Sequence, residues 1–189
     1  MMYAASQVAG VTTAVEETGA ASLHWLGEAA FRDFYDRTAR RLWAYLAAAS
    51  GDRMLADDLT QEAFIRLLHA AIRPESDEHL RRYLFRIATN LLQDHRRGSR
   101  RLLPLAAAPK GPAPAPDAAA RIDLRRLLAR LAPRERQILW LAHVEGGSHA
   151  EIAAITGLGP ASVRVLLFRA RRRLAGLLRA AGLAPEEKP

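Results

Sequence analysis

The chain has 189 residues, half of them hydrophobic, and a formal charge of +8 that arginine supplies almost alone, because Lys110 and Lys188 are its only lysines. This composition is typical of one globular domain or two small ones and excludes a disordered chain. The absence of cysteine excludes disulfides, thiol catalysis and cysteine-based zinc sites.

Two features of the sequence bear on where the protein works. The longest unbroken apolar run, 42–49, is too short to cross a bilayer, which needs about 18 residues. The first 30 residues contain no Lys or Arg, so the positive start of a secretory signal is missing. We therefore expect a cytoplasmic protein without membrane insertion. The arginine surplus suits phosphates and guanine edges, which makes nucleic acid the leading partner, with a merely soluble basic surface as the alternative.

Helical periodicity recurs along the chain and strand-like alternation does not, so the sequence predicts an all-α fold. Prolines at 104, 109, 112, 114 and 116 interrupt the pattern and favour an extended Pro/Ala-rich linker. At about 3.1 Å per residue, residues 104–117 reach roughly 43 Å, which exceeds one turn of duplex DNA. We expect two small helical domains, tethered but not fused. The predicted segments are a flexible arm (1–25), a first domain (26–101), the linker (102–120), a second domain (121–180) and a tail (181–189).

The first domain begins with two predicted helices. The first carries a single apolar stripe, formed by Phe31, Phe34, Tyr35, Thr38, Leu42, Tyr45 and Leu46. The second follows a turn in which Ser50 or Asp52 offers an N-cap, and it is expected to run to about Ile72 before Pro74 ends it. Its predicted buried side comprises Leu55, Leu59, Ala63, Leu67 and Ala71.

The second helix contains the acidic stretch DDLTQEAFIRLL at 57–68. Asp58, Gln61, Glu62 and Ile65 stand at i, i+3, i+4 and i+7, so they form one strip beside the buried side. A solvated face with acid favoured by the helix dipole accounts well for Asp57 and Asp58, and less well for Glu62. A surface that meets nucleic acid has no use for carboxylates, so the strip indicates a different partner.

The third predicted helix starts after Pro74, with Ser76 as its cap and Asp77 and Glu78 in its first turn. Its polar side carries Arg82, Arg86, Asn90, Gln93 and Arg97. Between residues 81 and 101 seven arginines stand against one acid, Asp94. An ordinary solvated face usually mixes charge signs, so this strip favours phosphate neutralisation and base-edge hydrogen bonds.

The second domain reads as a helix-turn-helix. Ser148 and Glu151 form a capping box, Gly157 stops the short helix that follows, and Pro160 opens a longer basic helix. That helix is the one expected to enter a major groove, although a solvated three-helix bundle is the alternative. From 160 to 179 there are six arginines and no acid. Its inner side is predicted to bury Val163, Leu167, Ala170 and Leu174. Its outer side presents Ala161, Ser162, Arg164, Val165, Phe168, Arg169 and Arg172.

The segments DDLTQEAF and YLFRIATNLLQDHRR, followed across the linker by LAPRERQILWLAHVEGGSHAEIAAITGLGPASVRVLLFRARRRL, resemble the extracytoplasmic-function (ECF) group of bacterial RNA polymerase sigma factors. A helix-turn-helix alone is common, but the two domains in this order are specific. The resemblance implies a protein that binds core RNA polymerase and directs promoter recognition, DNA melting and transcription initiation.

The same resemblance implies three binding surfaces. The core polymerase, through the coiled coil of its largest subunit and its flap, is expected to bind a surface that includes Asp57, Asp58, Gln61, Glu62 and Ile65. The opened minus-ten element is expected at Arg73, Ser76, Arg82, Arg86, Asn90, Gln93 and Arg97. The minus-thirty-five duplex is expected at the helix-turn-helix, 149–168, through the outer-side residues named above. An anti-sigma factor is a further possible partner.

The sequence departs from the family pattern at a few positions. Pro74 stands where Gly is common, which bears on the base pocket. Val165 and Leu166 replace a small-polar and basic pair, and Phe168 replaces a usual His. These apolar side chains either meet thymine methyl groups or pack on a protein partner.

Two rival functions are open from the residues alone. One is a free-standing helix-turn-helix regulator that binds duplex DNA without polymerase; the acidic strip speaks against it, because such a regulator has no evident need for one. The other is an enzyme. The six histidines show no HExxH pattern and no Gly-rich phosphate loop occurs, so we expect no catalytic site, no metal site and no cofactor.

Overall fold

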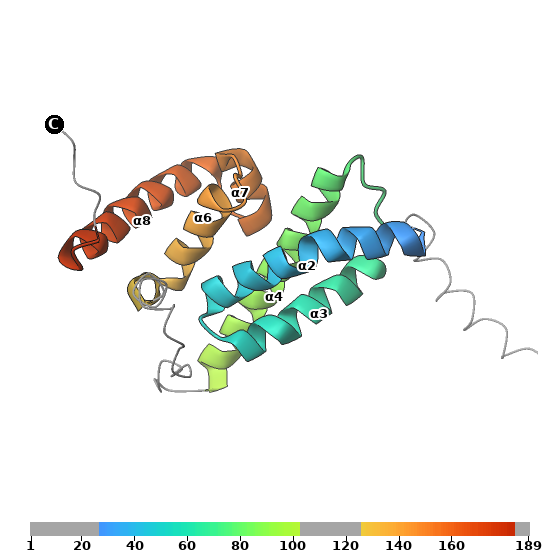
Figure 1. Cartoon of the computed structure of the whole chain (residues 1–189), viewed down its shortest axis with the longest axis horizontal. Coiled ribbons are helices and arrows are strands. Elements are labelled where there is room, and N and C mark those ends of the chain that lie inside the picture. Colours follow the sequence, from blue (N-terminus) through green and yellow to red (C-terminus); the bar gives the residue numbers. More distant parts are fainter. Residues whose placement is uncertain (1–26, 103–125, 184–189) are drawn as a thin grey trace, which may run out of the picture.

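The computed structural model describes residues 27–102 and 126–183. Within these ranges the chain forms helices and turns without a β-strand, which confirms the predicted all-α fold (Figure 1). The predicted arm, the linker beyond Leu102 and the last six residues of the tail lie outside the described residues. The principal helices are α2 (Glu28–Ser50), α3 (Arg53–Leu68), α4 (Asp77–Leu102), α6 (Pro133–His143), α7 (His149–Thr156) and α8 (Pro160–Ala180).

The first domain is a bundle of α2, α3 and α4, each of which packs against the other two. The stripe predicted on α2 is largely buried, and Ala49 extends it. The prediction that Tyr35 belongs to the buried stripe is wrong, because 43% of its surface is exposed. Its ring lies 4.7 Å from that of Phe64, on the outer edge of the α2 and α3 contact. A helical stripe has a finite width, and Tyr35 falls at its margin.

The end of α3 also differs from the prediction. The helix ends at Leu68, not at Ile72, and Ala71 is exposed rather than buried. The Nδ1 atom of the His69 ring lies 2.7 Å from the carbonyl oxygen of Ile65, which also accepts the His69 backbone N–H. The chain then tightens into a turn closed by Ala70, whose N–H donates to Leu67. The helix therefore stops before proline is reached.

The predicted helix starts in the first domain are confirmed by their caps. Of the two candidates for α3, Asp52 is the N-cap, and its side chain accepts from the backbone N–H of Leu55 at 3.2 Å. The Ser76 hydroxyl accepts from the backbone N–H of His79 at 3.1 Å and so caps α4. Each cap satisfies a backbone donor that the first helical turn leaves without a partner.

The second domain has the predicted helix-turn-helix. Pro133 opens α6, and the Ser148 and Glu151 capping box opens α7, with reciprocal bonds of 3.2 and 2.9 Å. Gly157 ends α7 in the left-handed region, at φ 69°, which turns the chain toward Pro160 and α8. Val163, Leu167 and Ala170 bury the inner side of α8 as predicted, and the fourth predicted residue, Leu174, is partly buried.

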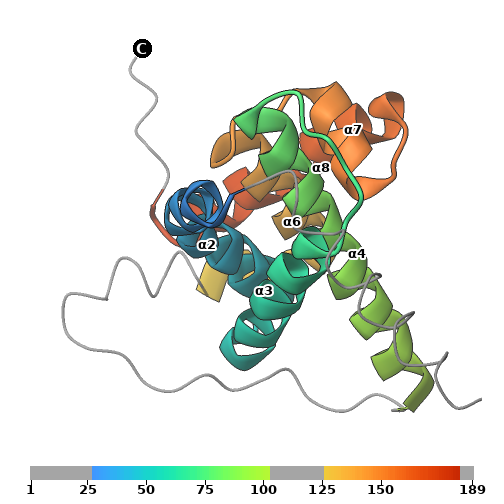
Figure 2. The same cartoon turned by 90° about the vertical axis from the view of Figure 1, so that its right-hand side faces the viewer.

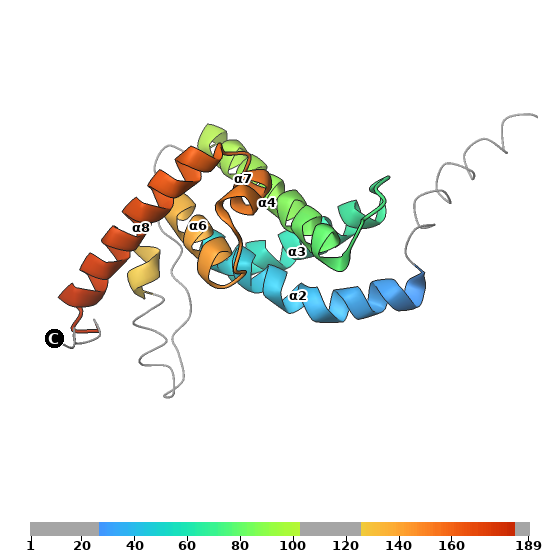
Figure 3. The same ribbon diagram turned by 90° about the horizontal axis from the view of Figure 1, so that it is seen from above.

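The two domains pack against each other. Helix α6 lies beside α2, and α7 lies along α4, in all three views (Figures 1, 2 and 3). The buried hydrophobic residues of both domains belong to one continuous cluster. The structure therefore differs from the expectation of domains that are tethered but not fused, because the linker sequence permits separation but does not enforce it.

No single helix in the described parts of the chain is long and apolar enough to span a membrane. Helices α7 and α8 reach the required length and apolarity only when taken together, and a bend of 102° separates them.

Two glycine substitutions should change stability in opposite directions. Gly157→Ala should lower the free energy of unfolding by about 1 kcal/mol, because a Cβ is strained at positive φ. Gly98→Ala, inside α4 and equally free of close neighbours, should raise it by up to about 1 kcal/mol by reducing the entropy of the unfolded chain. Urea unfolding of both variants measures these changes in the free energy of unfolding. Changes of the same sign in both variants would contradict the assigned backbone conformations.

Candidate functional site

An open groove of about 640 Å³ runs between α2 and α3. Among the residues predicted to bind polymerase, Asp57, Gln61 and Ile65 line it. Asp57 is fixed in place, because its Oδ1 accepts the indole N–H of Trp43 at 2.6 Å. The other lining residues are Phe31, Tyr35, Ala39, Arg40, Trp43, Thr60, Phe64 and Leu68. The groove thus combines aromatic and aliphatic side chains with one carboxylate, one amide and the guanidinium of Arg40.

The remaining two residues of the acidic strip lie in the neighbouring row of α3. Asp58 is exposed, and the Glu62 Oε1 accepts from the Nε of Arg66 at 2.7 Å. The structure therefore brings all five predicted residues to one helix but divides them between the groove and its flank. Sequence reasoning missed the contribution of Phe31, Tyr35 and Trp43. Phe31 and Tyr35 belong to the apolar stripe that the sequence predicted to be buried core.

The polar strip of α4 is only partly open. Arg86, Asn90 and Arg97 are exposed. Arg82 and Gln93 are half-buried where α7 lies along α4. In the preceding loop Arg73 is exposed, and the hydroxyl of Ser76 is already engaged as the cap of α4.

The outer side of α8 is free for contact. All seven residues predicted for it are exposed, including Val165 and Phe168, which expose 47% and 59% of their surface. Arg172 lies over the Phe168 ring at 5.7 Å, which orders the two side chains together. Other arginines of α8 are tied within the domain. Arg171 donates to the Nε2 of His143 at 3.1 Å, and Arg173 donates to the backbone carbonyl of Arg130 at 3.2 Å.

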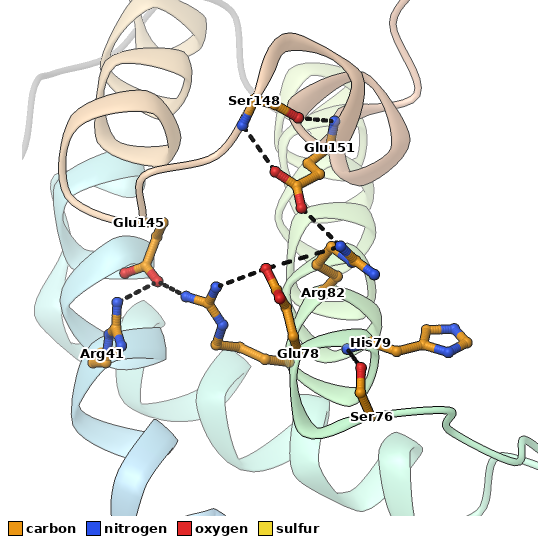
Figure 4. Close-up of polar contacts among 9 residues, drawn as sticks. Arg41, Ser76, Glu78, His79, Arg82, Glu145, Ser148 and Glu151 are labelled. Carbon is orange, nitrogen blue, oxygen red and sulfur yellow. Dashed lines mark hydrogen bonds and ion pairs between the residues drawn. The ribbon is translucent and has the colours of Figure 1, made fainter.

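Two carboxylates of the second domain bind arginines of the first, and no sequence pattern predicted these pairs (Figure 4). The Glu151 Oε1 accepts from the Arg82 Nη1 at 2.7 Å. The Glu145 Oε2 accepts from Arg41 of α2 at 3.0 Å and from Arg81 of α4 at 2.9 Å. The Glu145 side chain is only 7% exposed, whereas the Arg81 side chain is 23% exposed and that of Arg41 is 49% exposed, so only the carboxylate is well shielded from water.

A buried polar cluster joins the same two domains. The Tyr45 hydroxyl of α2 lies 2.7 Å from the hydroxyl of Thr89 of α4, and it accepts from the Nε2 of Gln137 of α6 at 2.6 Å. Burial raises the pKa of Tyr45, so the phenol stays protonated and can donate to Thr89. Nearby, Arg136 of α6 donates to the Ala49 carbonyl at the end of α2, at 3.2 Å, and burial lowers its pKa.

Metal ligands do not gather in the described residues, where no group of three or more His, Asp or Glu side chains could hold an ion. The chemistry of these surfaces is that of binding: a largely apolar groove with an acidic flank, an arginine and amide strip, and a basic helix with two exposed apolar side chains. Together with the helix-turn-helix, they define a two-domain DNA-binding protein that also docks on protein.

Comparison with known families identifies the protein more closely. The family described as Sigma-70 region 2 matches residues 34–102, and Sigma-70 region 4 matches residues 121–174. The RNA polymerase sigma factor CarQ of Myxococcus xanthus is 32% identical over 155 residues, which cover 79% of this chain and 89% of CarQ. The ECF RNA polymerase sigma factor SigE of Mycolicibacterium smegmatis is 32% identical over 179 residues, covering 86% of this chain and 68% of SigE.

Solved structures show the same fold. CnrH in complex with the cytosolic domain of CnrY matches with a TM-score of 0.58 and 25% identity, covering 88% of this chain and 94% of CnrH. The sigma factor RpoE of Bartonella quintana, in complex with the anti-sigma factor NepR, matches with a TM-score of 0.66 and 23% identity, covering 79% and 96%.

The chain belongs to the ECF group of RNA polymerase sigma factors. It directs RNA polymerase to specific promoters, and the alternative of a free-standing regulator is not favoured. Sigma factors are transcription initiation factors and not enzymes.

The hydrogen bonds and ion pair of Glu151 should make the free energy of unfolding depend on pH in the acidic range. The pKa of Glu151 falls from its ordinary 4.5 to about 2, chiefly because the backbone N–H of Ser148 donates to the carboxylate and then because Arg82 does. A depressed folded-state pKa stabilises the protein above about pH 4.5, and this contribution is lost as pH falls toward 2. The shift corresponds to at most about 3 kcal/mol.

Glu151→Gln should therefore flatten the loss of stability between pH 4.5 and about 2, while also lowering stability at neutral pH. Urea unfolding free energies of both proteins across this range give the comparison. Parallel pH profiles for the variant and the natural protein would contradict the assignment.

Proposed function

We propose that the first domain docks on core RNA polymerase through the groove between α2 and α3 and its acidic flank. The support is the charge of this surface. On a chain of net charge +8, Asp57, Asp58 and Glu62 gather beside an exposed apolar side chain, Ile65, on one helix. Carboxylates around an apolar centre suit a basic protein surface and repel DNA, because complementary charge sets the choice of partner.

Glu62→Lys should weaken binding to core polymerase by at least about tenfold, because a like-charge contact across an interface costs several kcal/mol. Asp94→Lys is the matched control. It changes the charge by the same amount on an exposed side chain of α4, away from the groove. Pull-down with core polymerase measures the effect, and circular dichroism confirms that both variants keep their helices. Equal binding by Glu62→Lys and Asp94→Lys would remove the docking assignment.

For the promoter, we propose that the α4 strip and the loop before it bind the opened minus-ten element as single-stranded DNA. The residues are Arg73, Ser76, Arg82, Arg86, Asn90, Gln93 and Arg97. The strip combines guanidiniums for phosphates with amides for base edges, which single-strand recognition requires. Five members are exposed and accessible to incoming DNA: Arg73, Ser76, Arg86, Asn90 and Arg97.

The outer side of α8 is proposed to read the minus-thirty-five duplex from the major groove. The proposal rests on the exposure of Ala161, Ser162, Arg164, Val165, Phe168, Arg169 and Arg172, which lie on one side of the second helix of a helix-turn-helix. Exposed Val165 and Phe168 suit thymine methyl groups, which are read by apolar contact.

Arg169→Ala should weaken promoter binding by about 1 to 3 kcal/mol, and more for the preferred sequence than for others, if Arg169 contacts a base edge. Arg171→Ala is the matched control, because the same type of residue on the same helix is engaged with His143 within the domain. Titration of holoenzyme carrying each variant against promoter and scrambled duplexes distinguishes a base contact from a phosphate contact. A loss that is equal on all sequences would make Arg169 a phosphate contact.

The relatives suggest two further features. RpoE is solved with the anti-sigma factor NepR, and CnrH with the cytosolic domain of CnrY. We infer that an anti-sigma factor is a candidate partner of this chain as well. A cytoplasmic location follows from the proposed work on core polymerase and chromosomal DNA.

A further inference from the structure

The loop before α4 contains a hydrogen bond that the proposed function does not yet use. Ser76 caps α4, and three residues after a serine cap a Glu or Gln commonly completes a capping box by accepting the backbone N–H of the cap residue. In this chain the residue at that position is His79. Its Nδ1 accepts instead from the backbone N–H of Glu75, one residue farther from the helix, at 3.3 Å. The side chain of α4 therefore holds the loop and not only the start of the helix.

We propose that His79 is a positioning residue for recognition of the minus-ten element. By holding the backbone of Glu75, it keeps the loop that carries Arg73 in the conformation that meets single-stranded DNA, and it does so without touching the DNA itself. This inference rests on the proposed assignment of Arg73 and the α4 strip to the minus-ten element.

The first support is that the backbone is restrained on both sides of Arg73. Ile72 is partly buried and packs against the hydrophobic core. Pro74 has a fixed φ, and it also restricts the residue before it, Arg73, to extended backbone. The His79 hydrogen bond then restrains Glu75, the residue that follows. The exposed Arg73 side chain thus stands on a backbone with few remaining conformations.

This restraint gives a reason for the departure from the family pattern at Pro74. A glycine there would leave the loop many conformations, and binding of DNA would have to select one of them. A proline followed by a residue that His79 holds has much less freedom to lose. A loop ordered in advance raises affinity without adding any contact to the ligand.

The second support is a brace from another helix. The Nη1 atom of Arg37 on α2 donates to the Oδ2 of Asp77 at 2.7 Å, and Asp77 is the first residue of α4. The same guanidinium also pairs with Asp33 of α2, at 2.9 Å. The brace fixes where the loop joins the helix. It is an exposed ion pair and therefore weak by itself, so the restraint inside the loop depends on His79.

The His79 hydrogen bond lies apart from the contacts between the domains. Figure 4 shows the His79 ring projecting away from the ion pairs of Glu145 and Glu151. Neither carboxylate bonds to His79, so a substitution there leaves both ion pairs in place. An effect on DNA binding can then be assigned to the loop.

Two conservative variants separate positioning from helix capping. His79→Asn keeps an acceptor at the place of Nδ1, because the amide oxygen and Nδ1 are both bonded to Cγ. His79→Gln has no acceptor there, but it completes an ordinary capping box with Ser76. Glutamine is also the better helix former of the two. If His79 acts only as a cap, Gln should be tolerated better than Asn, whereas positioning predicts the opposite order.

Binding of holoenzyme to a forked promoter measures the effect. The fork is duplex across the minus-thirty-five element and single-stranded across the minus-ten element of a promoter that the natural holoenzyme transcribes. His79→Gln and His79→Ala should weaken fork binding about three- to tenfold, the range of one hydrogen bond, while His79→Asn stays within about twofold. Binding to a duplex that ends before the minus-ten element should be the same for all three variants and the natural protein.

The order of the variants decides the inference. Equal fork binding by His79→Asn and His79→Gln, or no loss with His79→Ala, would overturn it. Urea unfolding of each variant measures stability separately. Fork affinities that follow the order of the stabilities would make His79 a helix cap and would also overturn the inference.

A variant at Pro74 tests the restrained loop without changing His79. Pro74→Gly should weaken fork binding about two- to fivefold, because the loop regains conformations that binding must then remove. The upstream duplex should again bind as it does to the natural protein. Fork binding that is undiminished in Pro74→Gly would contradict a loop ordered in advance.

The same fork separates this inference from the proposed function. Asn90→Ala removes an exposed amide of the α4 strip that lies outside the loop. Weaker fork binding by Asn90→Ala together with unchanged binding by His79→Gln would overturn this inference alone. A natural holoenzyme that binds the fork no better than the upstream duplex would overturn the minus-ten assignment, and this inference with it.

Discussion

The hydroxyl of Tyr45 is the point on which the arrangement of the two domains depends. It is fully buried, so it must find partners inside the protein, and it finds Thr89 on α4 and Gln137 on α6. A buried polar group without partners is costly, whereas a satisfied one fixes a geometry. Tyr45 thereby sets how α2 meets both α4 within its own domain and α6 of the other. The ion pairs of Glu145 and Glu151 are arranged around that contact.

Acidic and basic side chains gather on different helices. Acid gathers on α3, around a groove with an apolar floor, and arginine gathers on α4 and α8. A sigma factor has to bind a protein and a polyanion at the same time, and opposite charges on separate helices prevent each partner from taking the other's surface. The net charge overstates the free positive surface, since Arg41, Arg81 and Arg82 are already held by carboxylates of the second domain.

The domain interface combines apolar and polar contacts. The shielded Glu145 carboxylate lies between two arginines, and the hydrogen bond of Gln137 to Tyr45 crosses an interface whose buried apolar side chains belong to one continuous cluster. An interface made only of apolar side chains would close the domains more permanently. The Arg82 guanidinium of the α4 strip is already paired with the chain's own Glu151.

The sequence by itself determined the helices, their caps and the inner and outer sides of α8, because these follow from local rules: Ser148 and Glu151 satisfy backbone donors, and Gly157 adopts the left-handed turn. It also carried the family resemblance. It could not place Tyr35 at the margin of its stripe, end α3 at Leu68, or divide the acidic residues between a groove and its flank, since these depend on neighbouring side chains. Only the tertiary structure decided that Glu145 and Glu151 meet Arg41, Arg81 and Arg82, because pairs 64 or more residues apart leave no local periodicity to read.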